Sequence, residues 1–562
     1  MGFDLVIRGA KVIDGTGLPG YVADVGIRGE RIGRIGRIHD HGAREIDGRG
    51  LVLAPGFIDV HTHYDVQLDW DPTASPASWH GVTTILAGNC GFTLAPARPE
   101  DVDWLAGMLS RVEGMSRAAL KVGLRFSGGG FGDYWRRFEG KLAVNVGSYV
   151  GHSAVRRYAM GDDASERAAT PDEIEAMKEL VRQAMKEGAI GFSTSQVDLH
   201  VGEDGREVPS NHATADEIVA LCSVLSEFDH GAIEIISRSF TAGYDEADRE
   251  LIRRMHEASG RPIELGPITP NADTPDGWSK TLAFVEEARE AGLRLHPQFM
   301  TNRAGFNLKL SDTFVFDNLL TWRETLCLEA NARLAALRDP SVRDRLRAEW
   351  DSPNAGTIAI DWALLTVRSV SDSAHRDWVG RSLAELAKER GGHVMDVFLD
   401  LCLAEDLELW WMLPPNEDMT RFMNHLTREA IRHPLVMSGS SDGGAHLATF
   451  VGADFTTRLL TDWVPDVLSL EQAIYRLTGM PATVHGLRDR GFIREGAFAD
   501  LVLFDPKRLA AGESYLLRDF PADSARFVID AEGYVSVIVN GQVAMDHGKY
   551  TGATSGRVIW GA

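Results

Sequence analysis

Cysteine, positive charge and long apolar runs are all scarce in this chain of 562 residues. Its four cysteines form no C-x-x-C pair, which argues against a disulfide framework and favours a reducing compartment. Acidic side chains outnumber basic ones 81 to 58, and a net charge of −23 argues against nucleic acid or an anionic membrane as the main partner. The sequence has no apolar run near the roughly 18 residues that span a membrane, and it has no signal-peptide pattern. We therefore expect a cytoplasmic protein.

The stretch Pro55–His63 carries the first candidate site. Phe57, Ile58 and Val60 predict a short buried strand, and the side chains of His61 and His63 share one face of it. Two imidazoles one pleat apart at the end of a strand can bind one divalent ion. The alternative is a pair of histidines beside a surface turn. Nearby acidic residues, and a second acidic strand end far downstream, favour the metal site.

Both ends of the chain predict β-structure. Residues 4–8, 11–13 and 23–36 alternate apolar and polar side chains between glycine turns, and residues 500–505 and 535–543 do the same. Neither end has enough strands to hold a core alone. We therefore expect one small β-sandwich domain built from residues 1–54 and 490–562.

The middle of the chain, residues 55–489, alternates short apolar strands with helices. Eight such units predict an α/β protein with a (β/α)₈ TIM-type barrel. The clearest helices are expected at residues 171–187 and 215–227. The expected strands are Phe57–His63, Val82–Cys90, Asn145–His152, Ala189–Ser195, Ala232–Arg238, Pro262–Ile268, Leu293–Met300 and Leu435–Asp442.

A long interval, about residues 301–433, separates the seventh strand from the eighth. It contains helical runs and six of the 13 tryptophans. One interpretation is a helical insertion that caps the barrel mouth and contacts the substrate. The other is a structural extension with an ordinary core.

Polar groups gather where the predicted strands end, which is where barrel enzymes keep their chemistry. Strand 1 ends in His61 and His63, and strand 2 ends in Asn89-Cys90. The third and fourth strands end in His152 and Ser195, and the eighth ends in Ser-Asp442-Gly-Gly.

These strand ends resemble the amidohydrolase superfamily and, within it, the N-acyl-D-amino-acid deacylase group. The resemblance lies in Pro-Gly-Phe-Ile-Asp-Val-His-Thr-His, Gly-Asn-Cys-Gly, Gly-His-Ser-Ala-Val-Arg, Gly-Phe-Ser-Thr-Ser and Gly-Ser-Ser-Asp-Gly, together with both β-rich ends. It implies a barrel with a β-sandwich and zinc-assisted hydrolysis of an amide-type bond. By position, His61, His63 and Cys90 are metal ligands and Asp442 is the general base.

The chemistry of these residues supports the same roles. A thiolate and two imidazoles suit zinc, and a carboxylate beside metal-activated water can accept its proton. Without the resemblance, Cys90 also fits a buried small apolar residue, and Asp442 also fits a turn residue before two glycines. No lysine stands at a strand end, so a carboxylated-lysine bridge is not indicated.

The sequence departs from the deacylase pattern at two metal ligands. The group ends strand 5 in Thr-His-x-Arg and strand 6 in Ser-His, but this chain has Ile236 and Gly266-Pro267 there. We therefore expect one metal ion per chain, zinc or another divalent metal, held by His61, His63, Cys90 and Asp442. His152 and His296 are reserve ligands or, alternatively, hydrogen-bonding residues.

The substrate is expected to be a small molecule. Arg238 stands where the deacylases keep an arginine, and a guanidinium pairs well with a carboxylate. A salt bridge at the rim is the alternative for Arg238. Ser195, His152 and His296 are further candidates for substrate contact.

Three functions stay open at this point. The first is a hydrolase of N-acyl-D-amino acids or related N-acyl compounds. The second is a hydrolase of a cyclic amide, a lactone or another ester on the same scaffold. The third is a metal-poor binding protein with an amidohydrolase-like fold. Members of the group are often oligomeric, so a homo-oligomer is possible.

Overall fold

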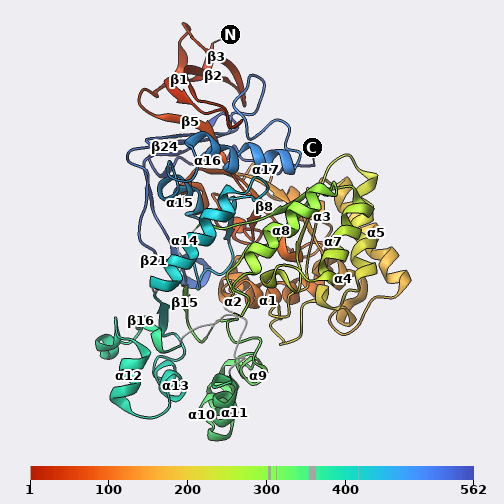
Figure 1. The fold of residues 1–562 in the computed structure, drawn as a ribbon, viewed down its shortest axis with the longest axis vertical. Coiled ribbons are helices and arrows are strands. Elements are labelled where there is room, and N and C mark those ends of the chain that lie inside the picture. Colours follow the sequence, from red (N-terminus) through yellow and green to blue (C-terminus); the bar gives the residue numbers. More distant parts are fainter. Residues whose placement is uncertain are drawn as a thin grey trace.

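The protein has a β-domain, a barrel and a helical lobe, which follow one another from top to bottom in Figure 1. The computed structural model describes residues 2–271, 273–301, 306–311, 313–352, 362–415 and 417–561. None of the described helices is long and apolar enough to cross a membrane.

The barrel is a closed circle of parallel strands, as the sequence predicted. Strands β6, β8 and β9 pair in that order, and β10 to β14 continue the circle. A parallel bridge between Gln298 and Met437 leads to β18, which pairs with β7. The strands are β6 (Phe57–Asp59), β7 (His61–Thr62), β8 (Val82–Ala87), β9 (Asn145–Ser148), β10 (Val150–Gly151), β11 (Gly191–Ser195), β12 (Ala232–Ile236), β13 (Ile263–Leu265), β14 (Leu295–Pro297) and β18 (Ser440–Gly443).

The first predicted strand is interrupted at Val60. The Val60 amide donates to the Gly439 carbonyl, so β6 pairs with β8 while β7 pairs with β18. The Thr62 hydroxyl donates to the Leu86 carbonyl, on the side away from the two neighbouring histidines. The interruption brings the end of strand 1 directly beside the end of strand 8.

Helices follow the barrel strands. Helix α5 begins with the predicted capping box, in which Thr170 and Glu173 each accept the other's backbone amide. The second predicted helix ends at Ser223 and continues as a 3₁₀ turn over Val224–Glu227. The helices around the barrel are α1 (Val102–Val112), α2 (Arg117–Gly123), α3 (Phe131–Arg136), α4 (His152–Met160), α5 (Pro171–Lys186), α6 (Ala215–Ser223), α7 (Glu246–Ser259), α8 (Gly277–Glu290), α14 (Glu417–Arg432), α15 (Phe455–Asp462), α16 (Leu470–Leu477) and α17 (Gly479–Val484).

Strands from both ends of the chain form one nine-stranded sheet, separate from the barrel. Strand β5 joins the two ends, because it pairs with β1 on one side and with β19 on the other. Apolar side chains from both ends, including Leu5, Val25 and Leu501, share one core. The strands are β1 (Phe3–Val12), β2 (Tyr21–Arg28), β3 (Arg31–Gly36), β4 (Gly42–Asp47), β5 (Val52–Pro55), β19 (Leu501–Phe504), β24 (Tyr534–Val539), β25 (Gln542–Asp546) and β26 (Lys549–Tyr550).

Two stretches within the predicted β-domain lie against other parts of the molecule. The hairpin of β21 (Tyr515–Phe520) and β22 (Ser524–Val528) buries Arg526, whose guanidinium donates to the backbone and hydroxyl of Ser75. Near the C-terminus, Val558 bridges to Val146 of barrel strand β9. These contacts with distant residues explain why the hairpin and the tail leave the nine-stranded sheet.

The predicted insertion divides into a lobe and a barrel helix. The lobe has its own aromatic core, in which Phe316 stacks on Trp322 at 4.3 Å and on Trp362 at 4.9 Å. Helix α14 returns to the barrel and packs there through Leu426 and Ile431. Residues 302–305, 312, 353–361 and 416 of this interval lie outside the described residues. The lobe is formed by β15 (Phe306–Leu308), β16 (Thr366–Ser369), β17 (Trp410–Leu413), α9 (Leu320–Leu326), α10 (Ala330–Arg338), α11 (Pro340–Trp350), α12 (Leu383–Arg390) and α13 (Val394–Ala404).

Candidate metal centre

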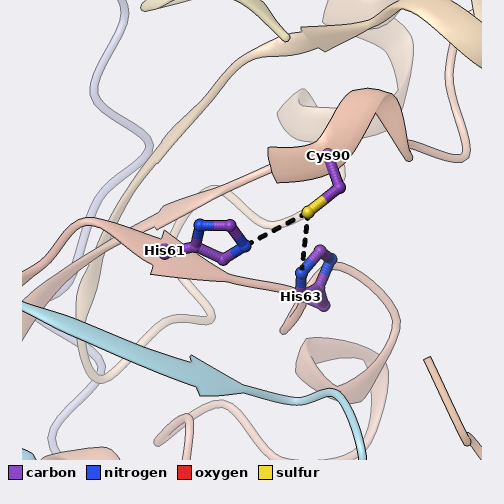
Figure 2. A group of neighbouring side chains, drawn as sticks. All are labelled: His61, His63 and Cys90. Carbon is purple, nitrogen blue, oxygen red and sulfur yellow. Dashed lines mark hydrogen bonds between the residues drawn. The ribbon is translucent and has the colours of Figure 1, made fainter. Parts of the chain in front are cut away.

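Two histidines and a cysteine meet at the mouth of the barrel. Figure 2 shows the side chains of His61 and His63, two residues apart along the chain, directed at the sulfur of Cys90. The Nε2 atoms of His61 and His63 lie 3.2 Å and 3.9 Å from the Cys90 Sγ. Cys90 follows β8 in a tight turn and has a φ of 58°. This left-handed backbone conformation is energetically unfavourable for residues other than glycine. That turn brings the sulfur to the histidines.

Asp442 adds a carboxylate to the same group. Its Oδ1 lies 3.2 Å from the His63 Nε2 and 3.7 Å from the His61 Nε2. Because Ser440 of β18 pairs with His61 of β7, the two strand ends hold these side chains together. Asp442 also has a positive φ, 56°. Left-handed backbone at a non-glycine residue is concentrated at functional sites.

Three of these donor atoms, on His61, His63 and Cys90, lie within 4.8 Å of one another, close enough to bind one zinc ion. Zinc bonds of about 2.0–2.3 Å to nitrogen, oxygen and sulfur place neighbouring donors about 3.3–3.6 Å apart. The observed separations of 3.2, 3.7 and 3.9 Å bracket that range. The donor set of two imidazoles, a thiolate and a carboxylate also suits zinc.

A buried chain of polar side chains holds His61 in place, and the sequence did not indicate it. The Gln298 Oε1 lies 2.6 Å from the His61 Nδ1, and the Gln298 Nε2 donates to Glu264 at 2.7 Å. The Tyr149 hydroxyl donates to the other oxygen of Glu264, which also pairs with His485. A hydrogen on His61 Nδ1 leaves the Nε2 lone pair free for a metal. The one feature that could have revealed the network is Glu264, a glutamate in the middle of the apolar strand Ile263–Leu265, which the sequence analysis did not single out.

Glu113 and His446 also reach this site, and sequence reasoning missed both. The Glu113 Oε1 lies 3.4 Å from the His63 Nδ1. The His446 Nε2 lies 3.5 Å from the Asp442 Oδ2 and 3.7 Å from the Glu113 Oε2. His446 could have been noticed, because it follows Asp442 by four residues. Glu113 follows α1 in a stretch that carries no other sign of a site.

The charges of these groups are strongly coupled. Burial lowers the pKa of His61 to about 4. Burial also acts to lower the pKa of His63, but the carboxylates of Glu113 and Asp442 outweigh it and raise that pKa to about 9. Burial raises the pKa of the Cys90 thiol well above its usual value, and nearby carboxylates add to the effect. Without a cation, the protons therefore reside on His63 and Cys90, and a bound metal must displace them.

The donors line a cavity of about 130 Å³. Ile236 and Pro267 line it too, at the positions where the deacylase pattern expects histidines. Gly266 packs tightly there, since a Cβ on it would lie 2.9 Å from the Ile236 Cγ1. The strand 5 and strand 6 side of the cavity is therefore apolar.

The candidate substrate residues lie in different surroundings. The Ser195 hydroxyl contacts the His200 Nδ1 at 2.8 Å, and His200 lines the cavity. Arg238 is 58% exposed and pairs with Asp198 at 3.2 Å. The His296 Nδ1 faces the Leu435 carbonyl at 3.4 Å, and His296 is not among the residues that line the cavity.

His152 belongs to a buried network apart from the cavity. Its Nδ1 contacts the Thr194 hydroxyl at 2.8 Å, and its Nε2 contacts Glu217 at 3.0 Å. Arg156 also pairs with Glu217, and all three charged or ionisable side chains are fully buried. Both ring nitrogens of His152 thus have protein partners, which fits a structural role.

Glu217→Gln is expected to destabilise the fold by about 3–5 kcal/mol, because it leaves the buried Arg156 guanidinium without its counter-charge. Urea unfolding measures the change. Glu175→Gln is the control, since Glu175 is 70% exposed and pairs with Lys178 at the surface. Metal content should not change in either variant. Loss of metal from Glu217→Gln in the folded protein would instead connect the His152 network to the metal centre.

Comparisons with known proteins agree along the whole chain. The model of the amidohydrolase family matches residues 44–340 and 403–545. D-aminoacylase of Alcaligenes xylosoxydans xylosoxydans is 30% identical, over 99% of this chain and 97% of its own length. N-acyl-D-aspartate deacylase of the same organism is 30% identical, over 98% of this chain and 93% of its own length.

Solved structures give the same picture. A crystal structure of D-aminoacylase superposes with a TM-score of 0.67 at 26% identity, and 99% of each chain is covered. Another D-aminoacylase structure, with a TM-score of 0.66 at 26% identity over 99% of each chain, is described as having a binuclear metal centre.

Proposed function

The chain belongs to the amidohydrolase family, and we propose that it is a zinc-dependent hydrolase of N-acyl-D-amino acids or related N-acyl compounds. One observation carries the proposal. At the carboxyl ends of three barrel strands, donor atoms of His61, His63 and Cys90 lie within 4.8 Å of one another, and the Asp442 Oδ1 lies 3.2 Å from the His63 Nε2. Three relatives that align with 99%, 98% and 89% of this chain are named D-aminoacylase, N-acyl-D-aspartate deacylase and N-acyl-D-glutamate deacylase.

One zinc ion per chain is proposed, with His61 Nε2, His63 Nε2 and Cys90 Sγ as donors and with Asp442 Oδ1, which lies 3.2 Å and 3.7 Å from the two Nε2 atoms, as the fourth. Bound zinc supplies a Lewis acid and lowers the pKa of water toward neutrality. The Gln298 Oε1 accepts a hydrogen bond from the His61 Nδ1–H, which favours the tautomer with an unprotonated Nε2.

Asp442 is proposed as the general base. Its Oδ1 faces the two imidazoles, while its Oδ2 is directed toward His446. The imidazoles of His63, His446 and His61 hold the pKa of Asp442 below its usual range despite burial, so the carboxylate is ionised at neutral pH. Oδ2 can therefore accept a proton during attack and return it to the departing amine nitrogen.

A substrate panel tests the proposed reaction. The zinc-loaded protein should release amino acids from N-acetyl-D-amino acids faster than from the L-enantiomers, cyclic amides and lactones. Mass spectrometry of the products measures each rate. Turnover confined to cyclic amides or lactones would favour the second candidate function, hydrolysis of another carbon–nitrogen or ester bond. The apolar side formed by Ile236 and Pro267 is the observation that supports that candidate. Binding without turnover would contradict both.

Arg238 is proposed to bind the substrate carboxylate. It stands two residues after the cavity-lining Ile236. Its exposed guanidinium can release the Asp198 carboxylate and bind the carboxylate of a substrate instead. Arg238→Met should raise KM by about 10–100-fold with little change in kcat, because a charge-assisted hydrogen bond contributes about 1.5–3 kcal/mol. Steady-state kinetics measures both constants. An unchanged KM would contradict substrate binding by Arg238 and would mean that it only forms a surface salt bridge with Asp198.

A cytoplasmic location is proposed as well. All four cysteines are free in the structure, and three of them are buried, which suits a reducing compartment.

A further inference from the structure

His200 is a histidine of the cavity that the proposed zinc site does not use. It lines the same cavity as His61, His63 and Asp442, and it lies on the chain that leaves β11 at Ser195. Its Nδ1 contacts the Ser195 hydroxyl at 2.8 Å. Among the described residues, no side chain or backbone group forms a hydrogen bond or an ion pair with its Nε2. One ring nitrogen is therefore available to a molecule in the cavity.

We propose that His200 is a catalytic residue, whose Nε2–H donates a hydrogen bond to the carbonyl oxygen of the bond that is cleaved. The inference rests on the proposed function, because the carbonyl oxygen belongs to the N-acyl group of the substrate. Negative charge develops on this oxygen during hydrolysis, and a fixed donor in a site shielded from water stabilises it strongly.

The Ser195 hydroxyl determines which nitrogen of His200 carries the hydrogen. Ser195 is fully buried, so its O–H needs an acceptor inside the protein. Within the described part of the chain, its Oγ has two partners, the His200 Nδ1 and the Val197 amide, which donates to it. The hydroxyl hydrogen therefore goes to Nδ1. A neutral imidazole that accepts at Nδ1 carries its own hydrogen at Nε2, so Nε2 is a donor.

The surroundings of His200 hold its ring in one orientation. The His200 amide donates to the Val197 carbonyl at 2.9 Å, and the Val208 amide donates to the His200 carbonyl at 3.0 Å. Phe92, which closes the turn that carries Cys90, packs edge to face on the imidazole at a centroid distance of 5.1 Å. A donor that is oriented before the reaction does not have to reorganise when charge develops, and this makes it effective.

His200 is uncharged at neutral pH. Burial lowers its pKa to about 3, and the imidazoles of His446 and His63 act in the same direction. A cation in the cavity would add to this effect, because like charges disfavour the protonated ring. His200 is therefore suited to donate a hydrogen bond and not to supply a proton.

The proposed reaction balances without a proton from His200. Attack by water forms a carbon–oxygen bond at the acyl carbon, moves the π electron pair onto the carbonyl oxygen and passes one proton to the Asp442 Oδ2. The carbonyl then forms again, the carbon–nitrogen bond breaks, and the same proton goes to the departing nitrogen. The products are a carboxylic acid and an amine. His200 keeps its Nε2–H throughout and stabilises the oxygen while it is negative.

Kinetics of the zinc-loaded, full-length protein tests the proposal, with the substrate that the wild type hydrolyses fastest. His200→Leu should lower kcat by about 10²–10³-fold, the usual effect of removing one such donor, with little change in KM. His200→Gln should keep most of the activity, because its amide can direct an N–H into the cavity. His212→Leu is the matched control. His212 lies on the same connection from β11 to α6 but does not line the cavity, so kcat should not change.

A phosphonate analogue of the same substrate separates a catalytic role from a structural one. Its charged oxygens imitate the attacked carbonyl, so its inhibition constant should rise in His200→Leu by the factor by which kcat/KM falls. Zinc content should stay at the wild-type value. An unchanged kcat, a rise in KM alone or a loss of zinc in His200→Leu would overturn the role of His200. A wild type that binds zinc but hydrolyses nothing in the substrate panel would contradict the proposed function and this role together.

Discussion

Replacement of Asp442 by asparagine should lower kcat by about 10²–10⁴-fold, the usual contribution of a general base. The amide keeps the size of the side chain and can still direct an oxygen at the cavity, but it cannot accept the proton. Asparagine also tolerates the positive φ of 56° at this position, so the fold should persist. Steady-state kinetics on the N-acetyl-D-amino acid that the wild type prefers measures the loss. The assay uses saturating zinc so that weaker metal binding does not contribute.

Asp523→Asn is the control for this substitution. Asp523 also has a positive φ, 54°, its side chain is 81% exposed, and it does not line the cavity, so the same chemical change occurs outside the proposed site. Its kcat should equal that of the wild type. If zinc-loaded Asp442→Asn kept full activity, another group would have to take the proton, and Glu113 is the nearest other carboxylate in the cavity.

Replacement of Cys90 by alanine is expected to weaken zinc binding more than any change outside the four donors. The Cys90 sulfur lies 3.2 Å from the His61 Nε2 and, as a metal-bound thiolate, would be the softest donor of the set. Gln298→Leu, which removes an outer partner of His61, should weaken binding by about 10–100-fold, and Cys90→Ala should exceed that range. Competition with a chromophoric chelator measures both affinities.

Cys402→Ala controls for the loss of a buried thiol. Cys402 is fully buried in the lobe, where its sulfur accepts from the Trp411 indole, so its removal should leave zinc affinity unchanged. Equal zinc affinity in Cys90→Ala and the wild type would mean that Cys90 is a packing residue. The proposed ligand set would then be wrong.

Local sequence patterns predicted the barrel from its alternating strands and helices, and the sheet domain from the apolar–polar alternation at both ends of the chain. Apolar–polar alternation, short apolar runs and glycine turns are local features of the sequence. Alternation predicts strands with one buried face, and continuous apolar runs predict strands that are buried on both faces. The side chains of His61 and His63 were placed by the two-residue period of a strand. That argument held although the strand is interrupted at Val60, because the interruption precedes both histidines.

Contacts between distant parts of the chain were not predictable in the same way. Gln298 reaches His61 across 237 positions, and Glu113 comes to the site on a turn after α1. Neither residue belongs to a motif with fixed spacing. The hairpin at residues 515–528 lies within the range 490–562 that was assigned to the β-domain, but it pairs outside the nine-stranded sheet. Burial of Arg526 beside Ser75, a tertiary contact, decides its position.

Metal content of the purified protein tests the central claim most directly. Inductively coupled plasma mass spectrometry is applied to the wild type and to a His61→Ala, His63→Ala double variant after removal of loosely bound ions. The account predicts about one tightly held zinc ion per wild-type chain and none in the double variant. A wild type without zinc, even after growth with added zinc, would contradict the proposed mechanism.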